Sequence, residues 1–165
     1  MKLLFATDQR VENVLQPSWS EYDLKEGLWA IPAERRKNRF EAMEPHIIPL
    51  AEFHLHLLEQ VRVTTDTPEW LFSHKDWKQL RKADVLYQAT HRFCKTNGIE
   101  PFAPRDYRRT FKSLAGSIGI DLELRNRLQG QAMTDVDSVH YDPWSYLSEK
   151  KVKISKNGLS GCFSK

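Results

Sequence analysis

Apolar residues recur every three to four positions in several parts of the chain, which is the spacing of one face of a helix. One such segment places Phe53, Leu57 and Leu58 on the same side. Gly98 and Gly130 close two others, and a glycine is typical of the residue that follows a helix. We predict helices over 51–63, 82–98, 104–119, 122–130 and 135–142, with one more over 144–154.

Two short apolar segments bounded by prolines predict strands instead of helices. They are 26–32, which closes at Pro32, and 46–50. The residues between them are charged and turn-prone, so we expect a two-stranded hairpin with a long tip. A brief buried strand or extended segment is predicted at 70–73.

The pattern at the start of the chain fits two short helices. A turn near Thr7 and Asp8 separates them, and Pro17 ends the second. The predicted fold class is therefore mainly α-helical with a small antiparallel β-sheet or hairpin.

The composition is that of an ordinary folded domain, with 165 residues, 40% of them apolar and 28% charged. The net charge of +3 is distributed unevenly, because residues 149–165 hold five lysines and one acid. That segment carries 5 − 1 = +4, which leaves −1 for the remainder. We predict one domain over 1–148, followed by a basic tail over 149–165.

Several classes of protein are excluded by the sequence. No apolar run approaches the roughly 18 residues of a membrane span, and the first residues lack the apolar core of a signal peptide. Cys94 and Cys162 match no metal-binding spacing, so we expect reduced thiols and a cytoplasmic location. His54 and His56 fall on different sides of a predicted helix, which argues against a metal site. Neither a metal nor a cofactor is predicted.

The segment 104–141 concentrates the candidate chemistry. Arg105, Arg108 and Arg109 lie within five residues at the start of a predicted helix, and Tyr141 follows two short helices later. Guanidinium groups bind phosphate oxygens through forked, charge-assisted hydrogen bonds, and a phenol oxygen is a nucleophile once it loses its proton. The set suits gripping a phosphodiester while a tyrosine attacks it.

This arrangement resembles the tyrosine recombinases, the phage integrase family, over about 3–147. TDQRVEN is similar to the family's first arginine box, T-G-x-R-x-x-E, and places Arg10 as the first active-site arginine. The predicted hairpin resembles the family's strand-turn-strand hairpin, whose tip lysine is catalytic. Lys37 is the best match for that lysine, ahead of the neighbouring Arg35, Arg36 and Arg39.

Three further boxes follow in the family's order. PRDYRR resembles H-x-x-R, so Arg108 takes the place of the second arginine, and Arg105 stands where histidine is usual. LQGQ resembles L-x-G-H, which puts Gln131 at another histidine position. VHYD resembles the nucleophile box and assigns Tyr141, ten residues after Gln131, as in the family.

The resemblance implies a fold and a chemistry. The fold is that of a recombinase catalytic domain, in which Tyr141 is the nucleophile, Arg10 and Arg108 clamp the phosphate, and Lys37 is the general acid. These enzymes cut and rejoin DNA through a covalent 3′-phosphotyrosine, with no metal and no nucleotide. A glutamine cannot shuttle a proton and an arginine does not lose one, so both departures reduce acid-base assistance. Arg105 and Gln131 are then auxiliary phosphate donors.

The implied partner is double-stranded DNA, with self-association on DNA, as a tetramer in the family, and no membrane. Family members place a separate helical domain before this one, and no such core-binding domain precedes Met1 here. The expected activity is site-specific DNA recombination or integration, impaired by truncation and by the two missing histidines. One alternative is an integrase remnant that acts only as a DNA-binding or assembly module. Type IB topoisomerases are a further alternative that the LQGQ-to-tyrosine spacing favours less.

Three expectations concern placement in the fold. Arg10, Arg108 and Tyr141 are expected to converge on one basic concavity. Glu12 is expected to be structural and to pair with an arginine. A stripe on the helix over 104–119 is expected to belong to the core; its members are Phe111, Leu114, Ala115 and Ile118.

Overall fold

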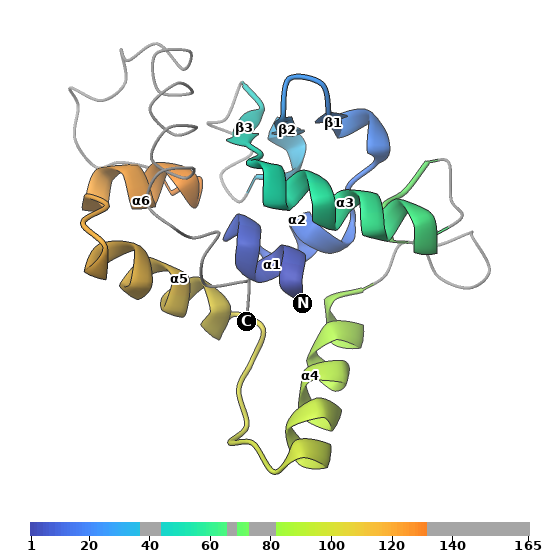
Figure 1. The fold of residues 1–165 in the computed structure, drawn as a ribbon, viewed down its shortest axis with the longest axis vertical. Coiled ribbons are helices and arrows are strands. Elements are labelled where there is room, and N and C mark those ends of the chain that lie inside the picture. Colours follow the sequence, from blue (N-terminus) through green and yellow to red (C-terminus); the bar gives the residue numbers. More distant parts are fainter. Residues whose placement is uncertain (37–43, 66–68, 73–81, 132–165) are drawn as a thin grey trace.

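The computed structural model describes residues 1–36, 44–65, 69–72 and 82–131. In these ranges the chain forms helices packed around a small sheet (Figure 1). Lys37 and Tyr141 lie outside the described residues, as do the predicted helices over 135–142 and 144–154. The elements are α1 (Lys2–Thr7), α2 (Val11–Leu15), β1 (Tyr22–Asp23), β2 (Leu28–Ile31), β3 (His46–Pro49), α3 (Glu52–Thr64), α4 (Ala83–Asn97), α5 (Asp106–Ser117) and α6 (Leu122–Leu128).

The sheet is antiparallel with the order β1-β2-β3, so the predicted hairpin is confirmed. Trp29 pairs with Ile48 at its centre. The strand β1 was not predicted, because two residues carry too little pattern to be distinguished from a turn. The segment predicted as extended at 70–73 contributes Trp70, which forms an isolated antiparallel bridge with Ser18.

The main core lies between the sheet and the helices α1, α2 and α3. Trp29 and Leu58 are fully buried at its centre, and the Tyr22 ring stacks on Trp29 with the ring centroids 5.2 Å apart. Figure 1 shows α3 lying across the sheet, with α1 beside it. This packing holds α1 and the turn that follows it in the middle of the molecule.

A second, smaller core joins α5 to α6. Phe111 and Ala115 are buried there, and Leu124 and Leu128 pack against them from α6. The stripe predicted to be core is therefore only half correct: Leu114 is 39% exposed and Ile118 is 42% exposed. The helix α5 packs mainly against two short helices, α1 and α6, so it buries a narrow face and the outer edge of the stripe stays in solvent.

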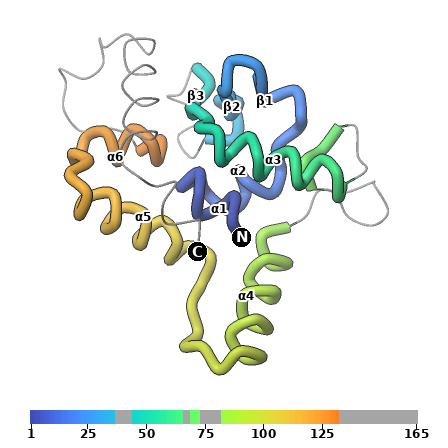
Figure 2. Tube along the Cα trace, viewed as in Figure 1, coloured from blue at the N-terminus to red at the C-terminus, as the bar shows by residue number. Residues whose placement is uncertain are grey.

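The helix α4 reaches away from the rest of the described chain, and an extended segment leads back from it to α5 (Figures 1 and 2). Gly98 ends α4 in the left-handed conformation, with φ 62°, as the sequence predicted. Thr90 and Cys94 are its buried side chains. No described helix is both long enough and apolar enough to span a membrane.

Candidate active site

Arg10 owes its position to a sharp break between the first two helices. After Thr7 ends α1, Asp8 adopts a left-handed conformation with φ 55°, and Arg10 becomes the N-cap residue of α2. Gln9 fixes this turn, since its amide nitrogen donates to the carbonyls of Thr7 (3.1 Å) and Leu128 (2.7 Å). The turn is thereby tied to the end of α6, which is distant in sequence.

Arg108 occupies the first turn of α5 and is half-buried. Its Nη2 donates to the carbonyl oxygen of Gln129 at 3.0 Å, and the Gln129 amide donates back to the Arg108 carbonyl at 3.3 Å. Its Nη1 is buried and has no hydrogen-bond partner among the described residues. One nitrogen of the guanidinium therefore helps to hold the fold together, while Nη1 is enclosed by the protein.

The two arginines lie close enough for their charges to interact. Burial lowers the pKa of Arg108, the carboxyl of Asp8 opposes that shift, and the charge of Arg10 adds to it. An arginine remains protonated in any case, so both side chains are cations. Two guanidinium groups at one place can clamp the oxygens of a single phosphate.

Asp8 is close enough to Arg108 for their charges to interact, and the sequence pattern assigned no functional role to it. Its side chain is almost fully buried, and neither carboxylate oxygen has a hydrogen-bond partner among the described residues. Burial raises its pKa to about 7, against the opposing influence of the Gln129 amide and the charges of Arg108 and Lys112. The signal in the sequence was that Asp8 stands at the glycine position of T-G-x-R-x-x-E.

The end of α6 presents the box that contains Gln131. Gly130 has φ 60°, and a Cβ built on it would lie 3.2 Å from the ring of His46. Gln131 is exposed, and its side-chain oxygen accepts a hydrogen bond of 3.4 Å from the Lys112 ammonium. Lys112 also donates to the Asn126 side chain at 2.8 Å.

His46 is the imidazole that the structure brings to this box. It is the first residue of β3, which is an outer strand of the sheet. Its Nε2 also lies 3.2 Å from the Leu128 carbonyl oxygen. Nothing in the sequence could have shown this contact, because it joins the sheet to a helix more than eighty residues away.

The remaining predicted cations differ in their surroundings. Arg105 is exposed at the N-cap of α5, and the exposed Arg109 pairs with Asp106 at 3.7 Å, a contact of little energetic value. Arg35 is used in the fold, since it pairs with Glu21 and donates to the Gln16 carbonyl.

The acidic position of the first box needs a correction. In T-G-x-R-x-x-E the glutamate comes three residues after the arginine, and that residue is Asn13 here, not Glu12. Asn13 is 4% exposed, whereas Glu12 is exposed on the outer side of α2. Asn13 therefore stands at the glutamate position of the box, and it is the buried residue of the two.

His54 is a structural residue. It is buried, its Nδ1 accepts the Ala51 backbone N–H at 3.0 Å, and its Nε2 donates to the Ala6 carbonyl at 2.9 Å. Burial lowers its pKa to about 4, with the two backbone hydrogen bonds opposing the shift. The ring ties α3 to α1 only while it is neutral.

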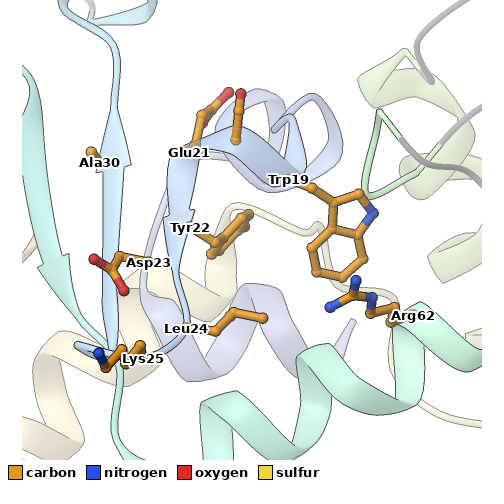
Figure 3. Close-up of a pocket in the computed structure, with 9 residues that line it drawn as sticks. Trp19, Glu21, Tyr22, Asp23, Leu24, Lys25, Ala30 and Arg62 are labelled. Carbon is orange, nitrogen blue, oxygen red and sulfur yellow. The ribbon is translucent and has the colours of Figure 1, made fainter.

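A separate hollow of about 690 Å³ lies beside β1 (Figure 3). Its walls include Trp19 and Arg62, whose guanidinium carbon is 5.7 Å from the centroid of the indole ring. Neither Arg10 nor Arg108 lines this hollow. None of the predicted site residues that the structure describes lines this hollow.

Asp8 and His54 are expected to give the folding stability opposite dependences on pH. The pKa of Asp8 is about 7 in the folded protein and 3.8 ordinarily. The stability that its protonated form contributes is therefore lost as the pH rises from 3.8 to about 7. The folded pKa of His54, about 4, lies below its usual 6.5, so its contribution is lost as the pH falls. The full effect reaches about 4 kcal/mol for Asp8 and about 3 kcal/mol for His54.

Urea unfolding between pH 4.5 and 8 measures both effects. Asp8→Asn is expected to gain stability relative to the unsubstituted chain as the pH rises, and His54→Gln is expected to lose the fall in stability at low pH. Curves for the two variants that run parallel to that of the unsubstituted chain would contradict these assignments.

Comparison with known proteins identifies the class first by its fold. The structure of XerA recombinase matches with a TM-score of 0.62 at 21% identity, covering 91% of this chain and 55% of that one. XerH site-specific recombinase bound to difH substrate matches at 0.63 and 18% identity, covering 92% and 45%. The Tn1549 transposon integrase in complex with circular intermediate DNA matches at 0.60 and 13%, covering 82% and 54%. The fold is that of tyrosine recombinase catalytic domains.

The sequence comparison then gives the family. The phage integrase family matches over residues 1–128, and the chain belongs to that family. No curated protein matched the sequence. The chain spans about half the length of the recombinase structures to which it is similar.

Proposed function

We propose that this chain forms the catalytic part of a tyrosine recombinase that cuts and rejoins DNA at specific sites. The observation that carries the proposal is the meeting of Arg10 and Arg108. They come from boxes at opposite ends of the described chain, and Gln9 and Gln129 tie those boxes together. Membership of the phage integrase family supports the same chemistry.

The proposed reaction is an in-line displacement at phosphorus. The phenol oxygen of Tyr141 forms a bond to the phosphorus, the bond to the 5′-oxygen of the next nucleotide breaks, and a 3′-phosphotyrosine results. Negative charge builds on the non-bridging oxygens, where Arg10 and Arg108 donate charge-assisted hydrogen bonds. The phenol releases its proton as it attacks, and Lys37 supplies a proton to the leaving 5′-oxygen.

Arg105 and Gln131 are proposed to assist phosphate binding only. Gln131 can donate a hydrogen bond from its amide to a phosphate oxygen, but it has no proton to exchange at neutral pH. Arg105 keeps its charge at any physiological pH. These two substitutions would therefore leave phosphate binding intact and slow the cleavage.

Duplex DNA is the proposed partner, with assembly of several copies on it. The XerH and Tn1549 integrase structures both contain DNA. The described chain matches about half of each of those proteins, so it would contact a duplex from one side. Binding that rests on phosphates is then weak and sensitive to salt.

A second candidate function is a DNA-binding or assembly module that no longer cleaves. The observation that favours it is the engagement of Gln131 with Lys112, at a box position where the family usually has histidine. Both candidates predict binding, and only the recombinase predicts a covalent product.

Incubation with nicked suicide duplexes tests the proposal. Loss of a short nicked fragment traps the intermediate, and we expect a protein–DNA adduct that peptide mapping places on Tyr141. Affinity should fall roughly a hundredfold from 50 to 200 mM salt if about four phosphates are contacted. Salt-sensitive binding without an adduct would favour the module, whereas tight binding that ignores salt would reject both candidates.

A further inference from the structure

The buried carboxyl of Asp8 interacts with the charge of Arg108, but the proposed reaction assigns it no role. It lies in the left-handed turn between α1 and α2, two residues before Arg10. A non-glycine residue with φ 55° is uncommon, and the strain is tolerated where the surroundings fix the residue. Gln9 provides that fixation through its two hydrogen bonds.

Three buried polar atoms at this place lack partners among the described residues. Two are the oxygens of Asp8, and the third is Nη1 of Arg108. An unpaired buried polar atom is costly, and an acceptor and a donor that are both unpaired complement each other. The charges of Asp8 and Arg108 interact, while Nη2 anchors the other side of the guanidinium.

We propose that Asp8 is a positioning residue for Arg108: its buried carboxyl group sets the charge beside the guanidinium and takes up a proton from solvent when Arg108 engages a phosphate. The inference rests on the proposed function, because the phosphate is that of bound DNA. A phosphate brings negative charge to a site that already holds a buried carboxylate. A negative charge at close range disfavours the ionised form of a carboxyl group, so binding of the phosphate favours protonated Asp8.

Several other charged and titratable groups lie near Asp8. On α5 they are Arg108 and Lys112, and Arg10 stands at the start of α2. His46 of β3 contacts the end of α6, and His54 of α3 contacts the end of α1. Burial keeps the pKa of Asp8 near 7, so its proton is exchanged in the physiological range.

The test is duplex affinity against pH for the full 165-residue chain, measured at low salt by fluorescence anisotropy. We expect affinity to fall about tenfold from pH 6 to pH 8. Titration calorimetry at pH 7 in two buffers of different ionisation enthalpy should show net proton uptake. Asp8→Asn and Asp8→Gly should both remove the pH dependence. Asparagine and glycine both tolerate the left-handed conformation of this turn, so neither substitution should disturb the backbone.

Matched controls separate Asp8 from its neighbours. Glu12→Gln removes one acidic group from the exposed side of the same segment and should keep the full pH dependence. His46→Gln should keep it as well. In the free protein, the Arg108 side-chain resonance should shift as Asp8 titrates and stay fixed in Asp8→Asn.

The failures are distinguishable. Duplex binding that retains its pH dependence in Asp8→Asn overturns the role of Asp8 and leaves the proposed function standing. An Arg108 resonance that ignores the titration of Asp8 also overturns it. No duplex binding at either pH would reject the proposed function together with this inference.

Discussion

Replacing Tyr141 with phenylalanine is expected to abolish the covalent DNA adduct and to leave duplex affinity nearly unchanged. The substitution removes only the oxygen that would attack phosphorus, so the ester cannot form at this position. Affinity rests on phosphate contacts by cations, which the substitution does not touch. Suicide-substrate trapping measures the adduct, and anisotropy with an uncleavable duplex measures the affinity.

Tyr87→Phe is the matched control, because Tyr87 is 40% exposed on α4 and lies outside the arginine pair. It should form the adduct at the unsubstituted rate. An adduct that persists in Tyr141→Phe would assign the nucleophile to a different residue. Loss of DNA affinity in the same variant would mean that the phenol contributes to binding, contrary to the proposed division of roles.

Local signals were enough to predict most of the fold. Helical spacing and the final glycine identified α4, and two apolar segments around a charged one identified the hairpin of β2 and β3. Such features act over a few residues, so a single sequence contains them. The exposed Leu114 and Ile118 show the limit, because the width of a buried face depends on which helix packs against it.

The site was predictable only in its cations. Arg10 and Arg108 followed from the boxes, but their support by Gln9 and Gln129 depends on contacts between distant segments. Asp8 was read as a turn residue, and its burial under Arg108 appears only when α1 and α5 are packed together. A sequence names the groups that can do chemistry, whereas folding decides which of them share a low-dielectric environment.

Arg105 and Gln131 stand where the family usually has histidine, and cleavage is expected to be slow for that reason. Histidine can be introduced at both positions. Gln131→His combined with Arg105→His is expected to raise the rate of adduct formation by about 10²–10⁴-fold, the usual range for a positioned acid-base group. Gln131→His alone should give a smaller gain. A histidine at the exposed N-cap position of Arg105 would face the positive end of the α5 dipole, which favours its neutral, proton-accepting form.

The control is Arg109→His, which makes the same exchange four residues further along α5, at a side chain that is 83% exposed. It should leave the rate unchanged, so a gain there would show that removal of a surface charge is sufficient. Duplex affinity should stay similar in all variants, because the Arg10 and Arg108 clamp is intact. A doubly substituted chain that is folded and bound to DNA but forms adduct no faster would show that proton transfer does not limit cleavage. The cause would then lie in the geometry around the phosphate, with Arg108 and its buried neighbour Asp8 as the first residues to vary.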